Sequence, residues 1–275
     1  MPRVGEDSSP GSEWDGHVLL LHASESERLS SLTAWARRGL DRGEKVIYTE
    51  GPGGQHQWLY RVLDVHGVDV AEAMRDGRLE ILPLAEFYPP DGQDRVIDRA
   101  LAEGFPAVRM SAEVTAALTV LSPEQYLDIE RNTDRLCRTR PVSAMCQYAR
   151  PDSIGTRLRD SVTVHVTGVR ESQLRTHPLR DGVALSGEVD LSNADVFAEV
   201  LRAAVSTGSD VLCLDLAMLH FVDAAACRQL VEATGDFRDS GGRVLLVAAQ
   251  PGVKRTMRLL GVHELPGVTI VGGRP

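Results

Sequence analysis

Residues 211–239 read VLCLDLAMLHFVDAAACRQLVEATGDFRD, and this stretch decides the fold of the C-terminal half of the chain. Its first four residues form a short apolar run that is typical of a buried strand. Asp223 predicts a helix start, because its carboxylate is suited to accept hydrogen bonds from the free N–H groups of a first turn. Leu230, Ala233 and Phe237 recur at helical spacing and predict a buried face. We therefore expect a strand over 211–214 and a helix over 223–239.

The alternation of strands and helices continues on both sides of this stretch. An Asp-Gly pair at 181–182 lies between two apolar runs, which predicts a β-hairpin with strands over 173–179 and 183–186. Apolar spacing predicts further helices over 193–206 and 253–260, and further strands over 243–247 and 268–271. Such alternation is the pattern of α/β layering.

The N-terminal half repeats the pattern. Strands are expected over 17–22, 45–49, 79–82, 107–110 and 142–147. Helices are expected over 26–40, from the loop at 51–54 to about residue 66, and over 95–103, 123–139 and about 154–160. Strands that alternate with helices favour a mostly parallel sheet, because parallel neighbours need crossover connections. We expect the boundary between the two halves within 166–172.

Composition narrows the classes of function. The chain has 275 residues, enough for two domains. Its net charge of −9 argues against a broad nucleic-acid-binding surface, so we expect no nucleic-acid partner. No apolar run approaches the ~20 residues that span a bilayer, so we expect no membrane association. Residues 1–14 are interpreted as a flexible leader. Cys137, Cys146, Cys213 and Cys227 have no Cys-x-x-Cys spacing, so we expect no metal site or disulfide framework and a cytoplasmic location.

Three separated segments of the C-terminal half carry a resemblance to a known family. They are 185–190 (LSGEVD), 211–223, and 241–247 (GGRVLLV) with 251–255 and 259–261 behind it. Their order and spacing resemble the STAS domain of bacterial anti-sigma-factor antagonists. The resemblance implies a STAS domain over 172–275, folded as an α/β sandwich with a mixed sheet and acting as a non-catalytic protein-binding module.

The same resemblance implies a partner and a surface. The partner would be an anti-sigma factor or a related serine kinase, and the implied binding residues are Asp190, His220, Asp223, Ala224, Ala225 and Arg228. In regulated members of the family this loop reads Asp-Ser-Ser-Gly or similar, and phosphorylation of a serine there breaks binding. Residues 223–226 read DAAA in this chain, so the usual phosphoacceptor serine is replaced by alanine.

The N-terminal half resembles the MEDS sensory domain of methanogen and methylotroph regulators. The matching pieces are 16–17, 39–45, 67–70, 77–82, 103–105, 109–113 and 146–148. The resemblance implies a RecA-like, mostly parallel sheet with flanking helices over 15–168. Leu19 departs from the pattern, because members often carry cysteine two residues after the histidine at position 17.

Candidate ligand-binding residues of this half are His17, His22, Glu113, Cys146, Gln147 and Tyr148. Open α/β sheets bind ligands beyond the carboxyl ends of their strands, which favours His22, Glu113, Gln147 and Tyr148. The alternatives stay open: His17 and Cys146 also suit a core, and Glu113 also suits a cap or a pair with Arg109. Residues 22–28 (HASESER), at the implied phosphate-loop position, lack Gly-Lys-Ser/Thr, so triphosphate binding is not expected.

These observations predict a cytoplasmic signalling regulator that is not an enzyme and has no cofactor. A sensory N-terminal domain would bind a small-molecule ligand and control the binding of an anti-sigma factor by the STAS domain. Two alternatives remain at this stage. One is a degenerate nucleotide- or small-molecule-binding enzyme in the N-terminal half, and the other is a STAS scaffold protein.

Overall fold

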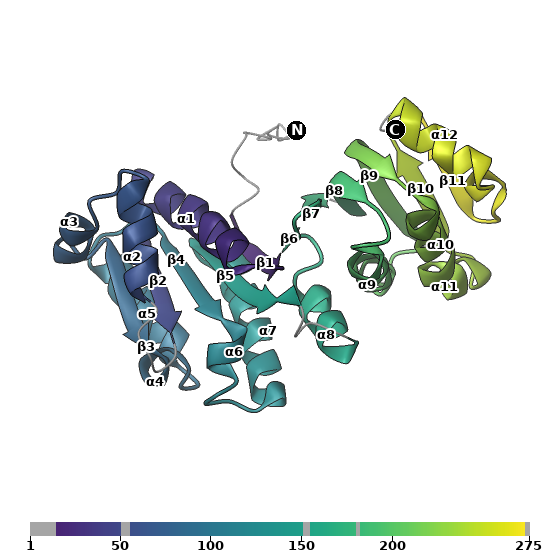
Figure 1. Cartoon of the computed structure of the whole chain (residues 1–275). Helices are drawn as coiled ribbons and strands as arrows, with labels where there is room; N and C mark the ends of the chain where they lie inside the picture. The colour runs from purple at the N-terminus through teal and green to yellow at the C-terminus, as the bar shows by residue number, and fades with distance from the viewer. Residues whose placement is uncertain (1–14, 51–55, 151–154, 180–181, 273–275) are drawn as a thin grey trace, which may run out of the picture. The chain divides into compact units, whose positions relative to one another are not determined.

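The computed structural model describes residues 15–50, 56–150, 155–179 and 182–272 (Figure 1). Contacts divide the chain into two units. The first runs up to Val18 and resumes over Leu29–Cys146, and the second comprises Leu19–Arg28 and the chain from Gln147 onwards. Strands β1 (His17–His22) and β5 (Val142–Ala149) are therefore divided between the units. The predicted leader and the predicted loop at 51–54 lie outside the described residues.

The first unit is built on parallel strands, as the sequence predicts. Strand β2 (Lys45–Glu50) pairs in parallel with β3 (Leu79–Pro83) and with β4 (Val108–Glu113). The strand order here is β1-β5-β4-β2-β3. Strand β4 continues beyond the predicted end at residue 110, because the hydroxyl of Ser111 donates to the carbonyl of Met145 at 2.9 Å and so satisfies a polar residue inside the sheet.

Four longer helices accompany these strands: α1 (Glu25–Asp41), α2 (His56–Val65), α5 (Gly92–Ala102) and α7 (Pro123–Thr139). The start of α7 is fixed by a capping box, in which the Ser122 hydroxyl accepts from the Gln125 N–H and the Gln125 side chain accepts from the Ser122 N–H. The short helices α3 (Val70–Arg75), α4 (Leu84–Phe87) and α6 (Val114–Ala117) were not predicted, because four to six residues carry too little periodicity.

A fully buried arginine lies inside the first unit. Arg109 pairs with Glu44 and Asp15, and its guanidinium lies 5.3 Å from the ring centre of Trp35. Gly39 leaves the room for it, since a Cβ at that position would lie 2.5 Å from Arg109 Cδ. Pairing and hydrogen bonding are what make a buried charge tolerable.

The second unit contains a mixed sheet in the order β11-β10-β9-β8-β7-β6-β1. Its strands are β6 (Val169–Arg170), β7 (Leu174–Leu179), β8 (Gly182–Val189), β9 (Val211–Val222), β10 (Arg243–Val247) and β11 (Val268–Val271). Strands β8 to β11 run parallel, whereas β7 pairs antiparallel with both β8 and β6. The antiparallel pairing of β7 and β8 confirms the predicted hairpin.

Helices α9 (Ala194–Val205), α10 (Ala224–Ala233), α11 (Gly235–Asp239) and α12 (Pro251–Leu259) belong to this unit, together with α8 (Thr156–Val164). Helix α9 contacts α8 and lies beside α10 (Figure 1). Buried leucine, valine and alanine side chains from β8, β9, β10 and α9 form the apolar core.

The helix predicted over 223–239 is wrong as a single element. It breaks at Thr234, where α10 ends and α11 begins. The Thr234 hydroxyl donates to the Leu230 carbonyl at 2.6 Å and accepts from Arg238 Nε at 3.1 Å, so local hydrogen bonds replace the continuous helical ladder. Gly235 follows directly and weakens helix propensity further.

The strand predicted over 211–214 is too short, because β9 continues to Val222. Its burial alternates beyond Leu214, with Leu216 buried and Asp215 and Ala217 turned toward solvent. Polar residues on the outward face of a strand interrupt an apolar run without ending the strand.

Candidate functional site

Three side chains of different chemistry meet in the interior of the first unit. His17 comes from the first residue of β1, Glu130 from the middle of α7, and Cys146 from β5. Glu130 reaches the interior because α7 buries one face, on which it lies between Tyr126 and Thr133. The side chain of His17 is 4 % exposed and that of Glu130 is 2 % exposed, so both are shielded from water.

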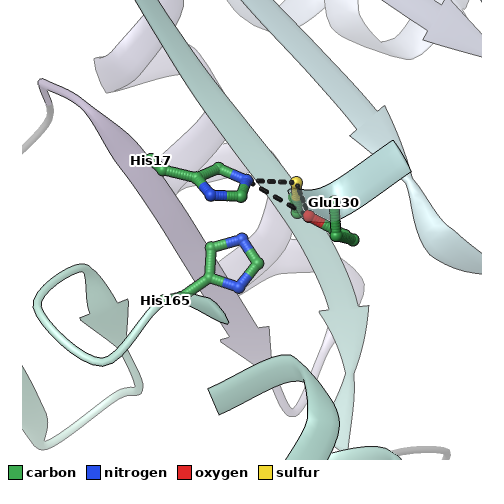
Figure 2. Close-up of side chains that lie close together, drawn as sticks. His17, Glu130 and His165 are labelled. Atoms are coloured by element: carbon green, nitrogen blue, oxygen red, sulfur yellow. Dashed lines mark hydrogen bonds and ion pairs between the residues drawn. The ribbon is translucent and has the colours of Figure 1, made fainter. Parts of the chain in front are cut away.

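The three side chains contact one another closely. His17 Nε2 lies 3.1 Å from Glu130 Oε2, the Cys146 thiol donates to the same oxygen at 3.2 Å, and Cys146 Sγ lies 3.5 Å from His17 Nε2. Figure 2 shows His17 and Glu130 pointing toward each other. On the other side of the imidazole, His17 Nδ1 lies 3.8 Å from Asp134 Oδ1, which is an ion-pair distance.

Electrostatics in this cluster favours a protonated histidine and a neutral thiol. Burial works to lower the pKa of His17, but hydrogen bonds and charge from Asp134 and Glu130 outweigh it and raise that pKa. The pKa of the Cys146 thiol is raised well above its usual value, first by burial and then by the Glu130 charge. The Glu130 carboxylate thus accepts from two partners in an interior that would otherwise disfavour its charge.

A small cavity adjoins the cluster. Its lining includes Glu130 and Cys146 together with the aromatic rings of Tyr88 and Tyr126, and its volume is ≈ 20 Å³. That is room for about one water molecule. Burial raises the pKa of Tyr88 well above its usual value, so this phenol stays protonated and keeps a donor inside the unit.

The structure brings two of the six predicted ligand residues, His17 and Cys146, to one place. Glu113, at the end of β4, is half-exposed and its carboxylate accepts from the Thr115 hydroxyl at 2.7 Å. The alternative pairing proposed for it involved Arg109, which pairs with Glu44 and Asp15.

The other three predicted ligand residues, His22, Gln147 and Tyr148, belong to the second unit and are buried. There the buried Arg28 donates to Gln147 Oε1 at 2.9 Å and to Glu25 Oε2 at 2.8 Å. Glu25 and Arg28 thus form an ion pair at the implied phosphate-loop position, where triphosphate binding was not expected. His165, which Figure 2 also draws, lies in this unit, where its Nδ1 is 2.7 Å from the Ser161 carbonyl oxygen.

Sequence reasoning missed Glu130 and Asp134, which complete the cluster around His17. Both lie on α7, whose residues were interpreted only as a helix. The signal was present: at helical spacing Tyr126, Glu130 and Thr133 share one face, and an acidic residue on an otherwise buried face indicates a partner inside the fold.

A second candidate surface surrounds the start of α10. Asp223 is the N-cap, as predicted, because its Oδ1 accepts from the Ala226 N–H at 2.8 Å. Its other oxygen accepts from the Leu191 N–H at 3.1 Å, so one carboxylate ties the loop after β8 to the start of the helix. We call the predicted partner-binding residues around it the α10 edge: Asp190, His220, Asp223, Ala224, Ala225 and Arg228.

The α10 edge lies at the surface. His220, Ala224 and Arg228 are exposed, and Asp190, Asp223 and Ala225 are half-buried. Large apolar side chains are exposed on neighbouring segments of the chain, at Leu191, Met218 and Phe221. Between α9 and α10 lies an open groove of ≈ 290 Å³, whose lining includes Leu191, Glu199 and Arg228.

Comparison with known proteins identifies two families along the chain. Residues 16–166 match the family model described as the methanogen/methylotroph, DcmR sensory domain (MEDS). Residues 172–271 match the model described as the Mlab, STAS domain. Among curated proteins none matches. None of the helices within the described ranges is both long and apolar enough to cross a membrane.

Solved structures also resemble part of the chain. An anti-sigma factor antagonist from Mycobacterium paratuberculosis is 20% identical, with a TM-score of 0.31, over 35% of this chain and 83% of that one. The anti-sigma factor antagonist SpoIIAA in its unphosphorylated form is 16% identical, with a TM-score of 0.30, over 36% of this chain and 87% of that one. The family models carry the assignment: this chain belongs to the MEDS family and carries a STAS domain behind its MEDS domain.

Proposed function

We propose that this chain is a cytoplasmic signalling regulator of the anti-sigma-factor-antagonist type and not an enzyme. Its STAS segment, residues 172–271, would bind an anti-sigma factor or a related serine kinase through the α10 edge. Its MEDS segment, residues 16–166, would sense a small molecule and control that binding. The observation that carries the proposal is the exposed start of α10 within a segment that matches the STAS family.

The chemistry of the α10 edge suits a protein partner. Interfaces are enriched in aromatic residues, methionine and arginine, and Phe221, Met218 and Arg228 are all exposed near the end of β9 or on α10. Leu191 is 75% exposed and adds apolar area to the same surface. A partner that covered these side chains would bury apolar area and leave the charged rim in water.

The alanines at 224–226 remove the usual means of release. Phosphorylation requires a hydroxyl, and none exists between Asp223 and Cys227. A phosphate at an interface would disrupt binding through repulsion and desolvation. We infer that this STAS segment binds its partner without that switch, and that control comes from the MEDS segment.

Contacts inside the second unit support such control. Arg150 donates to Asp195 Oδ1 at 2.7 Å and to the Ser192 carbonyl at 2.9 Å, and Arg159 lies 3.3 Å from Glu199. The two arginines belong to the MEDS segment, whereas Asp195 and Glu199 lie on α9 and Ser192 lies just before it. A ligand would act through these contacts only by binding two states unequally.

Calorimetric titration of the full chain with each anti-sigma factor of its source organism tests the partner. We expect one of them to bind, and Arg228→Glu to weaken that binding at least ~10-fold, the scale of an interface hot spot. Arg243→Glu is the matched control, because Arg243 is also exposed but pairs with the opposite end of β9. Failure of every anti-sigma factor to bind, or equal effects of both variants, would overturn the proposal.

A gain-of-function variant tests the missing switch. With the partner kinase and ATP, Ala225→Ser should acquire one phosphate and lose affinity, whereas the unaltered chain should keep its affinity. Intact-mass spectrometry and the same titration read both effects. An Ala225→Ser chain that is phosphorylated and still binds tightly would contradict the proposed interface.

Two further functions are less favoured. A nucleotide-binding enzyme would need the phosphate-loop position, which holds the Glu25–Arg28 ion pair. A scaffold made of self-associating STAS domains would need a self-complementary surface. Light scattering of the chain with and without an anti-sigma factor separates the scaffold from the regulator.

A further inference from the structure

The cluster of His17, Glu130 and Cys146 has the composition of a transition-metal site. It offers an imidazole nitrogen, a carboxylate oxygen and a thiol sulfur, one from each of three elements of the first unit. Nitrogen and sulfur ligands favour borderline-soft ions such as Zn²⁺ over Mg²⁺ and Ca²⁺, which prefer oxygen. The three ligand types come from β1, α7 and β5, so the tertiary fold brings them together.

The distances among the donor atoms fit such an ion. Zinc binds nitrogen and oxygen at about 2.0–2.2 Å and sulfur at about 2.3 Å, so ligand atoms of a tetrahedral site lie about 3.3–3.6 Å apart. Here Glu130 Oε2 lies 3.1 Å from His17 Nε2 and 3.2 Å from Cys146 Sγ. The third separation, between His17 Nε2 and Cys146 Sγ, is 3.5 Å. One separation lies within that range and the other two lie slightly below it, so the three donors form a nearly regular triangle close to the size of a zinc site.

The surroundings match the environment of known metal sites. A ligating histidine usually directs its second nitrogen to a carboxylate that orients the ring, and Asp134 lies on that side of His17 at 3.8 Å. The cavity of ≈ 20 Å³ beside Glu130 and Cys146 leaves room for about one water molecule. Zinc sites commonly have three protein ligands, and the fourth position is taken by water, a small ligand or another side chain.

We propose that His17, Glu130 and Cys146 bind one divalent transition-metal ion of the zinc class, with Asp134 as a positioning residue. Binding would replace both the thiol proton of Cys146 and the proton on His17 Nε2 by the metal and release the two protons to solvent, leaving a thiolate–metal bond and a neutral imidazole ligand. The ion would thereby satisfy the buried carboxylate, imidazole and sulfur together. The proposal concerns the first unit alone and does not depend on the partner of the STAS segment.

Titration of the metal-free full chain with Co²⁺, a spectroscopic substitute for Zn²⁺, tests the site. We expect about one equivalent to bind, with a thiolate-to-cobalt charge-transfer band and intense ligand-field bands. Competition with Zn²⁺ should remove both. Cys146→Ser should abolish the charge-transfer band, and His17→Gln should weaken Zn²⁺ binding more than ~100-fold, since even second-layer partners contribute about 10–100-fold. Asp134→Asn should lie within that smaller range.

The other cysteines supply the controls. Cys227→Ser removes a buried thiol of the second unit and should leave the spectrum unchanged. A chain with Cys137, Cys213 and Cys227 all changed to serine keeps Cys146 alone, and its band should persist. That chain also decides the question if Cys146→Ser does not fold. The proposal would be overturned if the triple-serine chain showed no thiolate-to-cobalt band, or if the band survived in Cys146→Ser. It would also be overturned if the unaltered chain bound Zn²⁺ no more tightly than His17→Gln does.

Discussion

The first unit and the STAS segment place their polar chemistry in opposite locations. The first unit buries ionisable groups, with Arg109 fully enclosed and Glu130 at 2 % exposure. Three of the buried polar residues described in the STAS segment, Thr176, Asn193 and Thr234, are uncharged and serve the local backbone or neighbouring strands. The charged exception, Glu199, is 9% exposed and pairs with Arg159 and Arg202, which both reach the surface. Because an ionised group costs free energy to bury, its presence in an interior points to a role there. The first unit thus holds its candidate site in the interior, whereas the site that we propose for the STAS segment, the α10 edge, lies at the surface.

The largest expected effect tests the interior of the first unit. In the presence of a chelator, Glu130→Ala should lower the free energy of unfolding by about 3–5 kcal/mol, because His17 and Cys146 lose their shared buried acceptor. Urea unfolding followed by tryptophan fluorescence suits this test, since Trp14, Trp35 and Trp58 all lie in the N-terminal half.

The control for Glu130→Ala lies on the same helix. Asp128 is 76 % exposed and pairs with Arg131 at the surface, so Asp128→Ala should change the free energy of unfolding by less than ~1 kcal/mol. Similar losses in the two variants would erase the contrast between a buried and an exposed carboxylate.

A middle-sized effect tests the surface of the STAS segment. Asp223→Ala should destabilise the start of α10 by about 1–2 kcal/mol, because it removes a helix cap and the bond to the Leu191 N–H. Asp223→Asn keeps an acceptor oxygen and should recover much of the loss. Hydrogen exchange at the amides of α10 is the measurement, since residues 172–275 contain no tryptophan or tyrosine. Unchanged exchange in Asp223→Ala would mean that the cap does not hold this edge together.

The smallest expected effect on stability belongs to Arg228→Ala. Arg228 is 62 % exposed and lies 4.0 Å from Glu232, and such pairs contribute about 0–1 kcal/mol. Thermal unfolding should therefore hardly change. A large loss of stability would show that Arg228 supports the fold, and any loss of partner binding in its variants would then need reinterpretation.

Sequence patterns predicted most elements but not their partners. The helix over 123–139 and the strands over 243–247 and 268–271 have the predicted bounds, because caps, prolines and compact apolar runs define them locally. The break at Thr234 depends on a contact with Arg238 that periodicity does not encode. The two-residue strand β6 exists only through pairing with β1 and β7.

The candidate site follows the same division. His17 and Cys146 were identified from their place in a resemblance to a family, whereas Glu130 and Asp134 lie more than a hundred residues from His17 along the chain. Their meeting depends on how α7 packs against the sheet, which one sequence does not specify. At the α10 edge the cap at Asp223 was predictable from local chemistry, but its second bond to Leu191 requires the tertiary fold.

The pairing of β6 with β7 bears on how this protein can be dissected. A fragment that starts at residue 172 would contain β7 without the strand beside it. The exposed N–H and C=O groups of β7 would form a free sheet edge, which is a template for another copy of the fragment. Dimers or aggregates of such a fragment would then reflect where the chain was cut. Recombinant fragments that retain 169–170 and the preceding helix, α8, would keep the pairing of Arg170 with Arg175 at the start of β7.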